Sequence, residues 1–131
     1  MKFMMIVKSA ERSGFPPPAL MEAINKLSQD AAKAGTMIGG GGLGPTALGA
    51  RVRLSDGKIT VTDGPFTEAK EVVGGLALLQ ANSKEEAIEL VKEFLQVAGD
   101  GECELRQLFE AGACPGPEVV AAARPQLATA D

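Results

Sequence analysis

The sequence predicts an α+β domain in which two amphipathic helices lie on a mostly antiparallel sheet. Three features predict it: two segments with apolar residues at helical spacing, short apolar runs between them, and an alternating segment around an Asp-Gly pair. In chain order these features read as strand, helix, strand, hairpin, strand, helix and strand, within 131 residues that fit one domain. That order is typical of a ferredoxin-like sandwich with an inserted β-hairpin.

The first and central strands are predicted over residues 3–8 and 72–81, where almost every residue is apolar. Both runs are too short for a helix and carry apolar side chains on both faces, as in strands that are covered on both sides. A last strand is predicted over residues 103–109. Two helices cover only one face of such a sheet, and a bare apolar face invites association, so we expect a homodimer that packs sheet against sheet.

Capping signals mark the ends of the two helices. Pro18 suits the first helical turn, and Gly35 suits the position after the last one. Between them, apolar residues recur at steps of three and four: Leu20, Ala23, Ile24, Leu27, Ala31 and Ala34. Ser83 and Glu86 have the spacing of a capping box, so the second helix begins there, and Gly99 ends it.

Residues 51–62 predict a β-hairpin, because Asp56-Gly57 is a favoured two-residue turn and the residues around it alternate in character. The register that this turn sets places Leu54 opposite Ile59. One face of the hairpin is then apolar and consists of Val52, Leu54, Ile59 and Val61. The other face carries Arg51, Arg53, Thr60 and Thr62.

Two groups of residues in this half of the chain are candidates for binding a ligand. Arg51 and Arg53, with Lys58 nearby, have the chemistry to hold a carboxylate or phosphate, although exposed charge on a strand face is also ordinary. Gly41 and Gly42 belong to a run of four glycines after a short strand that begins at residue 36. The run predicts a bulge or a close backbone approach. Anion binding by its N–H groups is the alternative, without the spacing of a P-loop.

The composition excludes several kinds of partner. The net charge of −4 argues against nucleic acid and against a polybasic membrane contact, because both need clustered Lys and Arg. No run approaches the 18 apolar residues of a membrane span, and the first apolar run is too short for a signal peptide. Cys103 and Cys114 lack the spacing of a zinc or redox motif. We therefore expect a cytoplasmic protein.

The absence of histidine limits the possible chemistry. The chain contains none, which excludes triads built on histidine, histidine metal ligands and the commonest general base near neutral pH. No cofactor motif or metal-ligand set is evident, so we expect neither a cofactor nor a metal. Any reaction would depend on carboxylates, Lys, Arg, Cys, hydroxyl groups or the backbone.

The tetrapeptide Asp63-Gly64-Pro65-Phe66 is the strongest local motif. Our first interpretation is a rigid turn in which the Asp63 carboxylate accepts nearby backbone N–H groups, Gly64 takes a positive φ, and Phe66 is buried in the core. The alternative hypothesis places Asp63, Glu68 and Lys70 around a cleft as candidate catalytic residues, with a carboxylate as general base. In both interpretations the loop borders a cleft, so Phe66 is also a candidate ligand contact.

Several motifs in order resemble the DGPF-type branch of the YCII-related proteins. They are the Met-Lys-Phe-Met start, the Pro-rich entry to the first helix, the glycine run before Ala-Arg-Val-Arg, the DGPF tetrapeptide with its following Glu-x-Lys, and the final Arg-Gln-Leu-Phe-Glu. The resemblance covers about residues 1–110 and implies a ferredoxin-like fold that forms a dimeric α/β barrel. Residues 111–131 are predicted to form an Ala- and Pro-rich tail, with at most a short helix near Pro117.

The resemblance also sets the expectations about function. Members of this branch are mostly without an established activity, and some are encoded beside extracytoplasmic-function sigma factors, which suggests regulation. A branch similar to chlorinated-aromatic dehydrochlorinases and muconolactone isomerases has a His-Asp pair around the first helix, which this chain cannot form. We therefore expect a dimeric module that binds a small ligand or regulates a protein partner such as a sigma factor. The alternative is an isomerase or lyase in which a carboxylate abstracts a proton.

Overall fold

The described part of the chain forms a four-stranded antiparallel sheet with two helices on one face and a separate β-hairpin. The computed structural model describes residues 1–9, 16–66, 71–110 and 116–117. The sheet has the strand order β2-β5-β1-β6, and its strands are β1 (Lys2–Ser9), β2 (Met37–Gly42), β5 (Val72–Gln80) and β6 (Glu102–Leu108). This order and the antiparallel pairing of all neighbours are those of a ferredoxin-like sheet. The predicted α+β fold class is confirmed.

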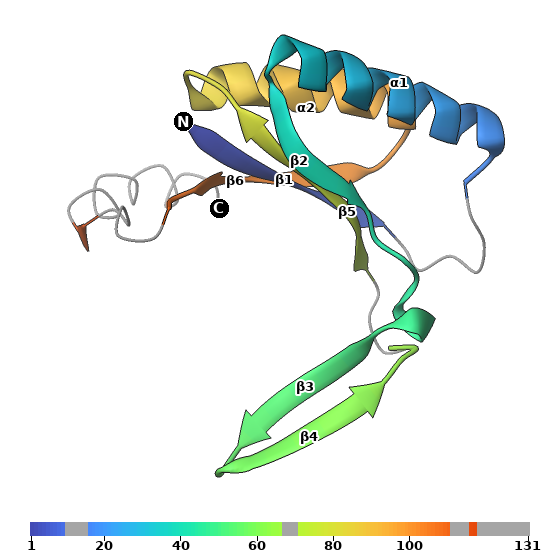
Figure 1. Cartoon of the computed structure of the whole chain (residues 1–131), viewed down its shortest axis with the longest axis vertical. Helices are drawn as coiled ribbons and strands as arrows, with labels where there is room; N and C mark the ends of the chain where they lie inside the picture. The colour runs from blue at the N-terminus through green and yellow to red at the C-terminus, as the bar shows by residue number, and fades with distance from the viewer. Residues whose placement is uncertain (10–15, 67–70, 111–115, 118–131) are drawn as a thin grey trace.

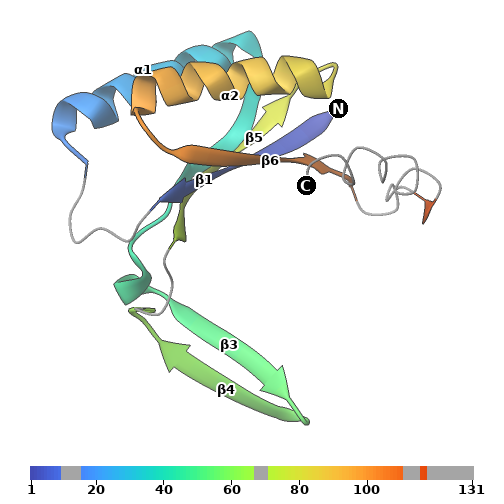
Figure 2. The same ribbon diagram turned by 180° about the vertical axis from the view of Figure 1, so that it is seen from behind.

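Both helices lie on the same face of the sheet, as Figures 1 and 2 show from opposite sides. They are α1 (Pro18–Ala34) and α2 (Lys84–Ala98). Neither they nor any other helix among the described residues is long and apolar enough to cross a membrane. The predicted tail over 111–131 lies outside the described residues, apart from Gly116 and Pro117.

The helix ends follow from the local sequence as predicted. Pro18 is the first residue of α1, and Gly35 closes it in the left-handed conformation with a φ of 78°. The Ser83 hydroxyl accepts a hydrogen bond from the Glu86 N–H at 3.1 Å. The Glu86 carboxylate accepts in return from the N–H of Asn82 at 3.3 Å, so the capping box is displaced by one residue from its usual form.

The core lies between the sheet and α2. Its buried residues are Phe3, Met5, Ala77, Leu79, Ala81, Ala87 and Val91. Val7, Cys103 and Leu105 pack against this cluster from the sheet, so Cys103 is a small residue at the edge of the core. The α1 helix has no buried residue, and Ala23 and Ala34 of its predicted apolar stripe are exposed. That helix contacts α2 and the edge strand β2, so only part of its stripe is covered.

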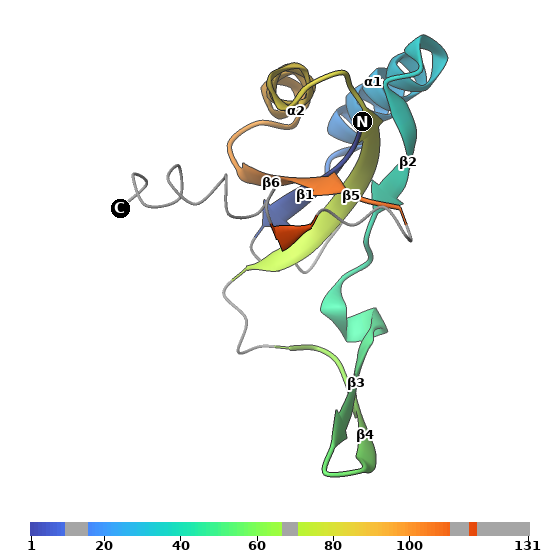
Figure 3. The same ribbon diagram turned by 90° about the vertical axis from the view of Figure 1, so that its left-hand side faces the viewer.

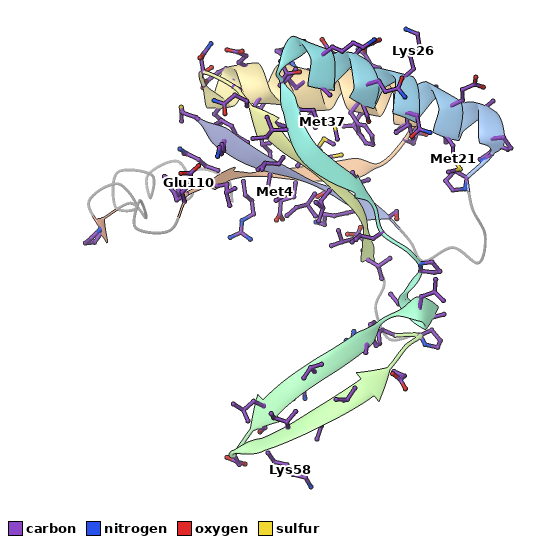
Figure 4. All side chains as sticks on the ribbon, in the orientation of Figure 1. Met4, Met21, Lys26, Met37, Lys58 and Glu110 are labelled. Carbon is purple, nitrogen blue, oxygen red and sulfur yellow. The ribbon has the colours of Figure 1, made fainter. Side chains whose placement is uncertain are left out.

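The opposite face of the sheet is apolar at its centre. Side chains alternate along a strand, so the neighbours of the core residues point away from the helices. They are Met4, Ile6, Leu76 and Leu78, and all four are half-buried. The register pairs Met4 with Leu78 and Ile6 with Leu76, so the four form one patch, which we call the open face. Figure 4 shows Met4 on this side, away from the helices.

The hairpin forms with the predicted turn and register. It consists of β3 (Ala50–Ser55) and β4 (Lys58–Asp63), and Leu54 lies opposite Ile59. The two turn residues between the strands have positive φ angles of 50° and 75°, as the favoured two-residue hairpin turn requires. The hairpin is a sheet of its own and extends away from the body on the side opposite the helices (Figure 3). We call residues 50–63 the arm.

The glycine run extends β2 further than the sequence indicated. The strand continues through Gly42, and its register against β5 shifts between Met37 and Gly39, which confirms the predicted bulge. At Gly40, with a φ of 130°, a Cβ would overlap the carbonyl oxygen of Leu76 and lie 2.6 Å from the Cα of Ala77. The close backbone approach therefore needs glycine at this one position.

Replacing Gly40 by Ala should destabilise the protein, whereas replacing Gly41 should not. A Cβ at Gly40 meets the β5 backbone at a φ that side chains rarely adopt, so we expect Gly40→Ala to lower the unfolding free energy by about 1–3 kcal/mol. A Cβ at Gly41 meets nothing within 4 Å. Gly41→Ala should therefore stay within about 0.5 kcal/mol of the unmodified chain. Urea denaturation measures both, and equal losses would contradict this account of the bulge.

Candidate functional site

A groove of about 490 Å³ lies where the arm joins the body. Its floor and walls come from the connection after β2, the short 3-10 helix η1 (Thr46–Leu48), the start of β3, Phe66 and the start of β5. Much of the lining is aliphatic and includes Leu43, Pro45, Leu48, Val72 and Val73. Among the described residues, two charged side chains line it, Arg51 from the arm and Glu71 from the body. A mainly apolar cleft with few polar groups is the usual form of a small-molecule site.

The groove depends on a clamp between η1 and the DGPF segment. The N–H of Gly64 donates to the carbonyl of Gly49 at 3.0 Å, and the N–H of Phe66 donates to the Thr46 hydroxyl at 3.1 Å. A Cβ at Gly64 would overlap the carbonyl oxygen of Thr46. Gly64 is not among the residues with positive φ. The prediction that Gly64 adopts a positive φ is therefore wrong. Glycine is needed at this position because it permits close contact with η1.

Phe66 lies in the groove, which corrects the prediction that its ring fills the core. The side chain is half-buried, and the core cluster does not include it. The guanidinium carbon of Arg51 lies 4.0 Å from the centre of the ring, a cation–π geometry. The clamp explains the difference, since it fixes the DGPF segment to η1 and so holds the ring at the base of the arm, outside the sheet.

Among the residues that the structure describes, the Asp63 side chain does not make the local hydrogen bonds that the turn interpretation expects. It is the last residue of β4, where it pairs with Ala50, and it is exposed. Within the described residues its carboxylate has no hydrogen bond or ion pair, so the expected local backbone bonds are not formed there. Asp63 also does not line the groove. Glu68 and Lys70 lie outside the described residues, so the catalytic role of the three stays a prediction.

The other candidate residues are only partly brought together. Arg51 and Phe66 meet in the groove, whereas Arg53 is exposed further along the arm. Gly41 and Gly42 pair with residues of β5 in the sheet, and neither lines the groove. An anion-binding role for these two glycines stays a prediction.

Sequence reasoning missed Thr46, Glu71 and Lys8. The Lys8 ammonium lies 3.2 Å from the Glu102 carboxylate and 3.8 Å from that of Glu71, so it joins the groove to the end of the sheet. The hydrogen bond to Glu102 and its negative charge raise the pKa of Lys8 above the ordinary value for lysine. These residues are far apart in the chain, and only the strand pairing of β1 with β5 and β6 brings them together.

Cysteine and metal chemistry find no support among the described residues. Burial, followed by the charge of Glu102, raises the pKa of the Cys103 thiol, which disfavours the reactive thiolate. Cys114 lies outside the described residues. No group of three or more metal-ligating side chains occurs in the part of the chain that the structure describes.

A second depression, of about 770 Å³, lies at the C-terminal end of α2. It is lined by Lys92, Leu95, Gln96, Gly99, Asp100 and Gly101. Within the described parts of the chain, it is lined by no aromatic ring and by none of the residues that the sequence motifs indicate. The groove at the base of the arm is therefore the better candidate site.

The fold and the groove define a ferredoxin-like α+β domain with a clamped arm beside a small cleft. The family model of the YCII-related domain matches residues 1–111. The chain therefore belongs to the YCII-related family, which confirms the resemblance seen in its motifs. Among curated proteins, no sequence matches this chain significantly.

One solved structure to which the chain is similar is a dehydrochlorinase. It is the 5-chloro-2-hydroxyhydroquinone dehydrochlorinase from Burkholderia phenoliruptrix, in complex with 2,5-dihydroxybenzoquinone. The two sequences are 17% identical, and the match covers 87% of this chain and 100% of the other with a TM-score of 0.42.

The clamp can be tested by replacing Gly64. We expect Gly64→Ala to separate the DGPF segment from η1, because backbone atoms of Thr46 cannot move aside as a flexible side chain would. Amide hydrogen exchange should then be at least about tenfold faster at the Phe66 N–H, since faster local opening reports a lost hydrogen bond. Gly42→Ala is the control, because a Cβ there meets nothing within 4 Å. Unchanged exchange at Phe66 in Gly64→Ala would show that the clamp does not depend on this contact.

Proposed function

We propose that this YCII-related protein is a dimeric module that binds a small organic anion in the groove. The observation that carries the proposal is the Arg51 guanidinium stacked 4.0 Å above the Phe66 ring at the edge of an apolar cleft. Stacking on a ring orients a guanidinium, whose N–H groups lie in its own plane and match the two oxygens of a carboxylate.

The lining indicates the kind of ligand. The aliphatic walls favour a compact apolar body, and the Phe66 ring offers a flat surface for it. Glu71 supplies a carboxylate on the body side of the groove, opposite in charge to Arg51 on the arm side. A small carboxylate that also carries a hydroxyl group would interact with both charged residues of the groove. Its carboxylate would bind Arg51, and its hydroxyl group would donate a hydrogen bond to Glu71.

The dimer and the regulatory role belong to the same proposal. The open face supports a second subunit, because an apolar patch of this kind is stabilised by association. Control of a protein partner such as an extracytoplasmic-function sigma factor rests on the resemblance of the motifs, as does a cytoplasmic location. In that role the ligand would be a signal that the groove detects.

Binding of benzoate tests the groove directly. We expect benzoate to bind the unmodified protein and to raise its thermal midpoint, because a ligand that binds only the folded state stabilises it. Arg51→Met should weaken binding at least about tenfold, which corresponds to about 1.4 kcal/mol. Arg53→Met removes the same charge from the same face of the arm without touching the groove, and it should bind like the unmodified chain. Equal losses in the two variants would indicate a general charge effect and contradict the assignment of Arg51.

The enzymatic alternative is supported by one observation, that the Glu71 carboxylate lines the groove. An isomerase or lyase of this type would abstract a proton next to a carbonyl group. Levulinate, a small keto acid, is a suitable probe, and NMR in D₂O follows exchange of its acidic protons. As a binding module, the protein should give no exchange above the background rate. Fast exchange that disappears in Glu71→Gln would instead identify an enzyme, with Glu71 as the base.

A further inference from the structure

The arm exposes a continuous apolar surface. Val52, Leu54, Ile59 and Val61 lie on one face of the two-stranded hairpin, and each is between 64% and 71% exposed. Val52 lies opposite Val61, and Leu54 lies opposite Ile59, so the four side chains form one patch. A patch of large aliphatic side chains on a protruding element is typical of an interaction surface.

In the described residues, the main support that the body of the subunit gives the arm lies at its base. The clamp joins Gly64 and Phe66, which follow the arm in the chain, to Gly49 and Thr46, which precede it, and the strands then extend away from the sheet, as Figure 3 shows. An isolated two-stranded hairpin is only marginally stable in water. Packing on another surface would therefore stabilise the arm and cover its apolar face.

A second copy of this chain fits that surface better than an unrelated protein does. The arm extends on the side of the sheet that the helices leave uncovered, which is also the side of the open face (Figures 1 and 3). A two-fold dimer uses the same surface of both subunits. Sheet-to-sheet pairing would then place the arm of each subunit beside the other, so that one interface covers both patches.

The distribution of charge agrees with a second copy as partner. At the tip of the arm, Arg53 and Lys58 lie on either side of Asp56. On β6, the exposed Glu104 and Arg106 are the register partners of the open-face residues 6 and 4 of β1. Both surfaces thus carry charges of both signs, which can pair between two copies of the chain.

We propose that the arm of each subunit packs its apolar face on the partner subunit, as an extension of the sheet-to-sheet interface. The inference rests on the proposed dimer and adds that the arm contributes to the contact between the two subunits. The groove lies at the base of this arm, so the position of the arm on the partner also fixes one wall of the ligand site.

The test combines a paired substitution with cross-linking. Leu54→Thr with Ile59→Thr makes the centre of the patch polar and keeps residues that favour strands. Thr60→Ser with Thr62→Ser alters the opposite face of the same strand and is the control. Sedimentation equilibrium should show a dimer for the unmodified chain, a loss of dimer affinity of at least about a hundredfold for the Thr pair, and a change within about threefold for the Ser pair.

Cross-linking from position 54 identifies the contact independently of affinity. A photoreactive phenylalanine analogue replaces Leu54, and chains labelled with ¹⁴N and ¹⁵N are mixed before irradiation. Mass spectrometry of the peptides should find cross-links that join the two isotopes. Cross-links confined to single chains would show that the arm folds onto its own subunit and would overturn the inference.

The two proposals fail in different ways. A monomeric unmodified chain at micromolar concentration would overturn both the dimer and the packing of the arm. A dimer that survives the Thr pair unchanged and gives no cross-links between chains would overturn the inference about the arm alone, and the sheet-to-sheet dimer would stand.

Discussion

The pairing of β1 with β5 at the centre of the sheet is the constraint on which the rest of the structure depends. Both strands are apolar on both faces, so hydrophobicity alone does not decide which face meets the helices. Side-chain size does not decide it either, because the helix face holds the large Phe3, Met5 and Leu79 beside the small Ala77. The helices cover this face, and Leu76 and Leu78 are left on the open face. The apolar surface of the open face therefore results from covering only one side of two strands that are apolar on both sides.

Local chemistry accounts for what the sequence predicted well. The hairpin turn and the caps of both helices depend on residues within a few positions of one another, such as Ser83 and Glu86. The extent of β2 could not be predicted this way, because its glycines are held in a strand by pairing with β5. The burial of the apolar stripe of α1 was also overestimated. Periodicity shows which face of a helix is apolar, but it does not show how much of that face another element covers. In each case the missing information is tertiary.

In the candidate site, too, the local features were predicted from the sequence and the tertiary contacts were not. Arg51 and Phe66 were each identified from the sequence, yet their contact depends on η1, which no motif marked. Thr46 makes the contact possible by accepting the Phe66 N–H and by lying against Gly64. For Asp63, the turn composition of the motif predicted hydrogen bonds from its carboxylate to the local backbone. Asp63 is instead the last residue of β4, where its backbone pairs with Ala50 and no such side-chain bond is needed. The motif therefore predicted the backbone arrangement better than the hydrogen bonding of this side chain.

The position of the arm in the chain links the two proposals. The ladder between β2 and β5 continues past β2, where the Leu43 N–H donates to the Gly74 carbonyl, so the ends of the insertion are already close. Inserting the arm there costs little closure entropy. Its angle is set by the clamp, and a ligand that touches both Arg51 and Glu71 would contact the arm and the body at once. If the arm also packs on the partner, ligand binding and dimerisation both depend on the position of the arm and are therefore coupled. Such coupling is reciprocal, so each event changes the affinity of the other by the same factor. A groove at the hinge of a dimer contact can thus transmit the presence of a small anion to the state of the whole assembly without catalysing any reaction.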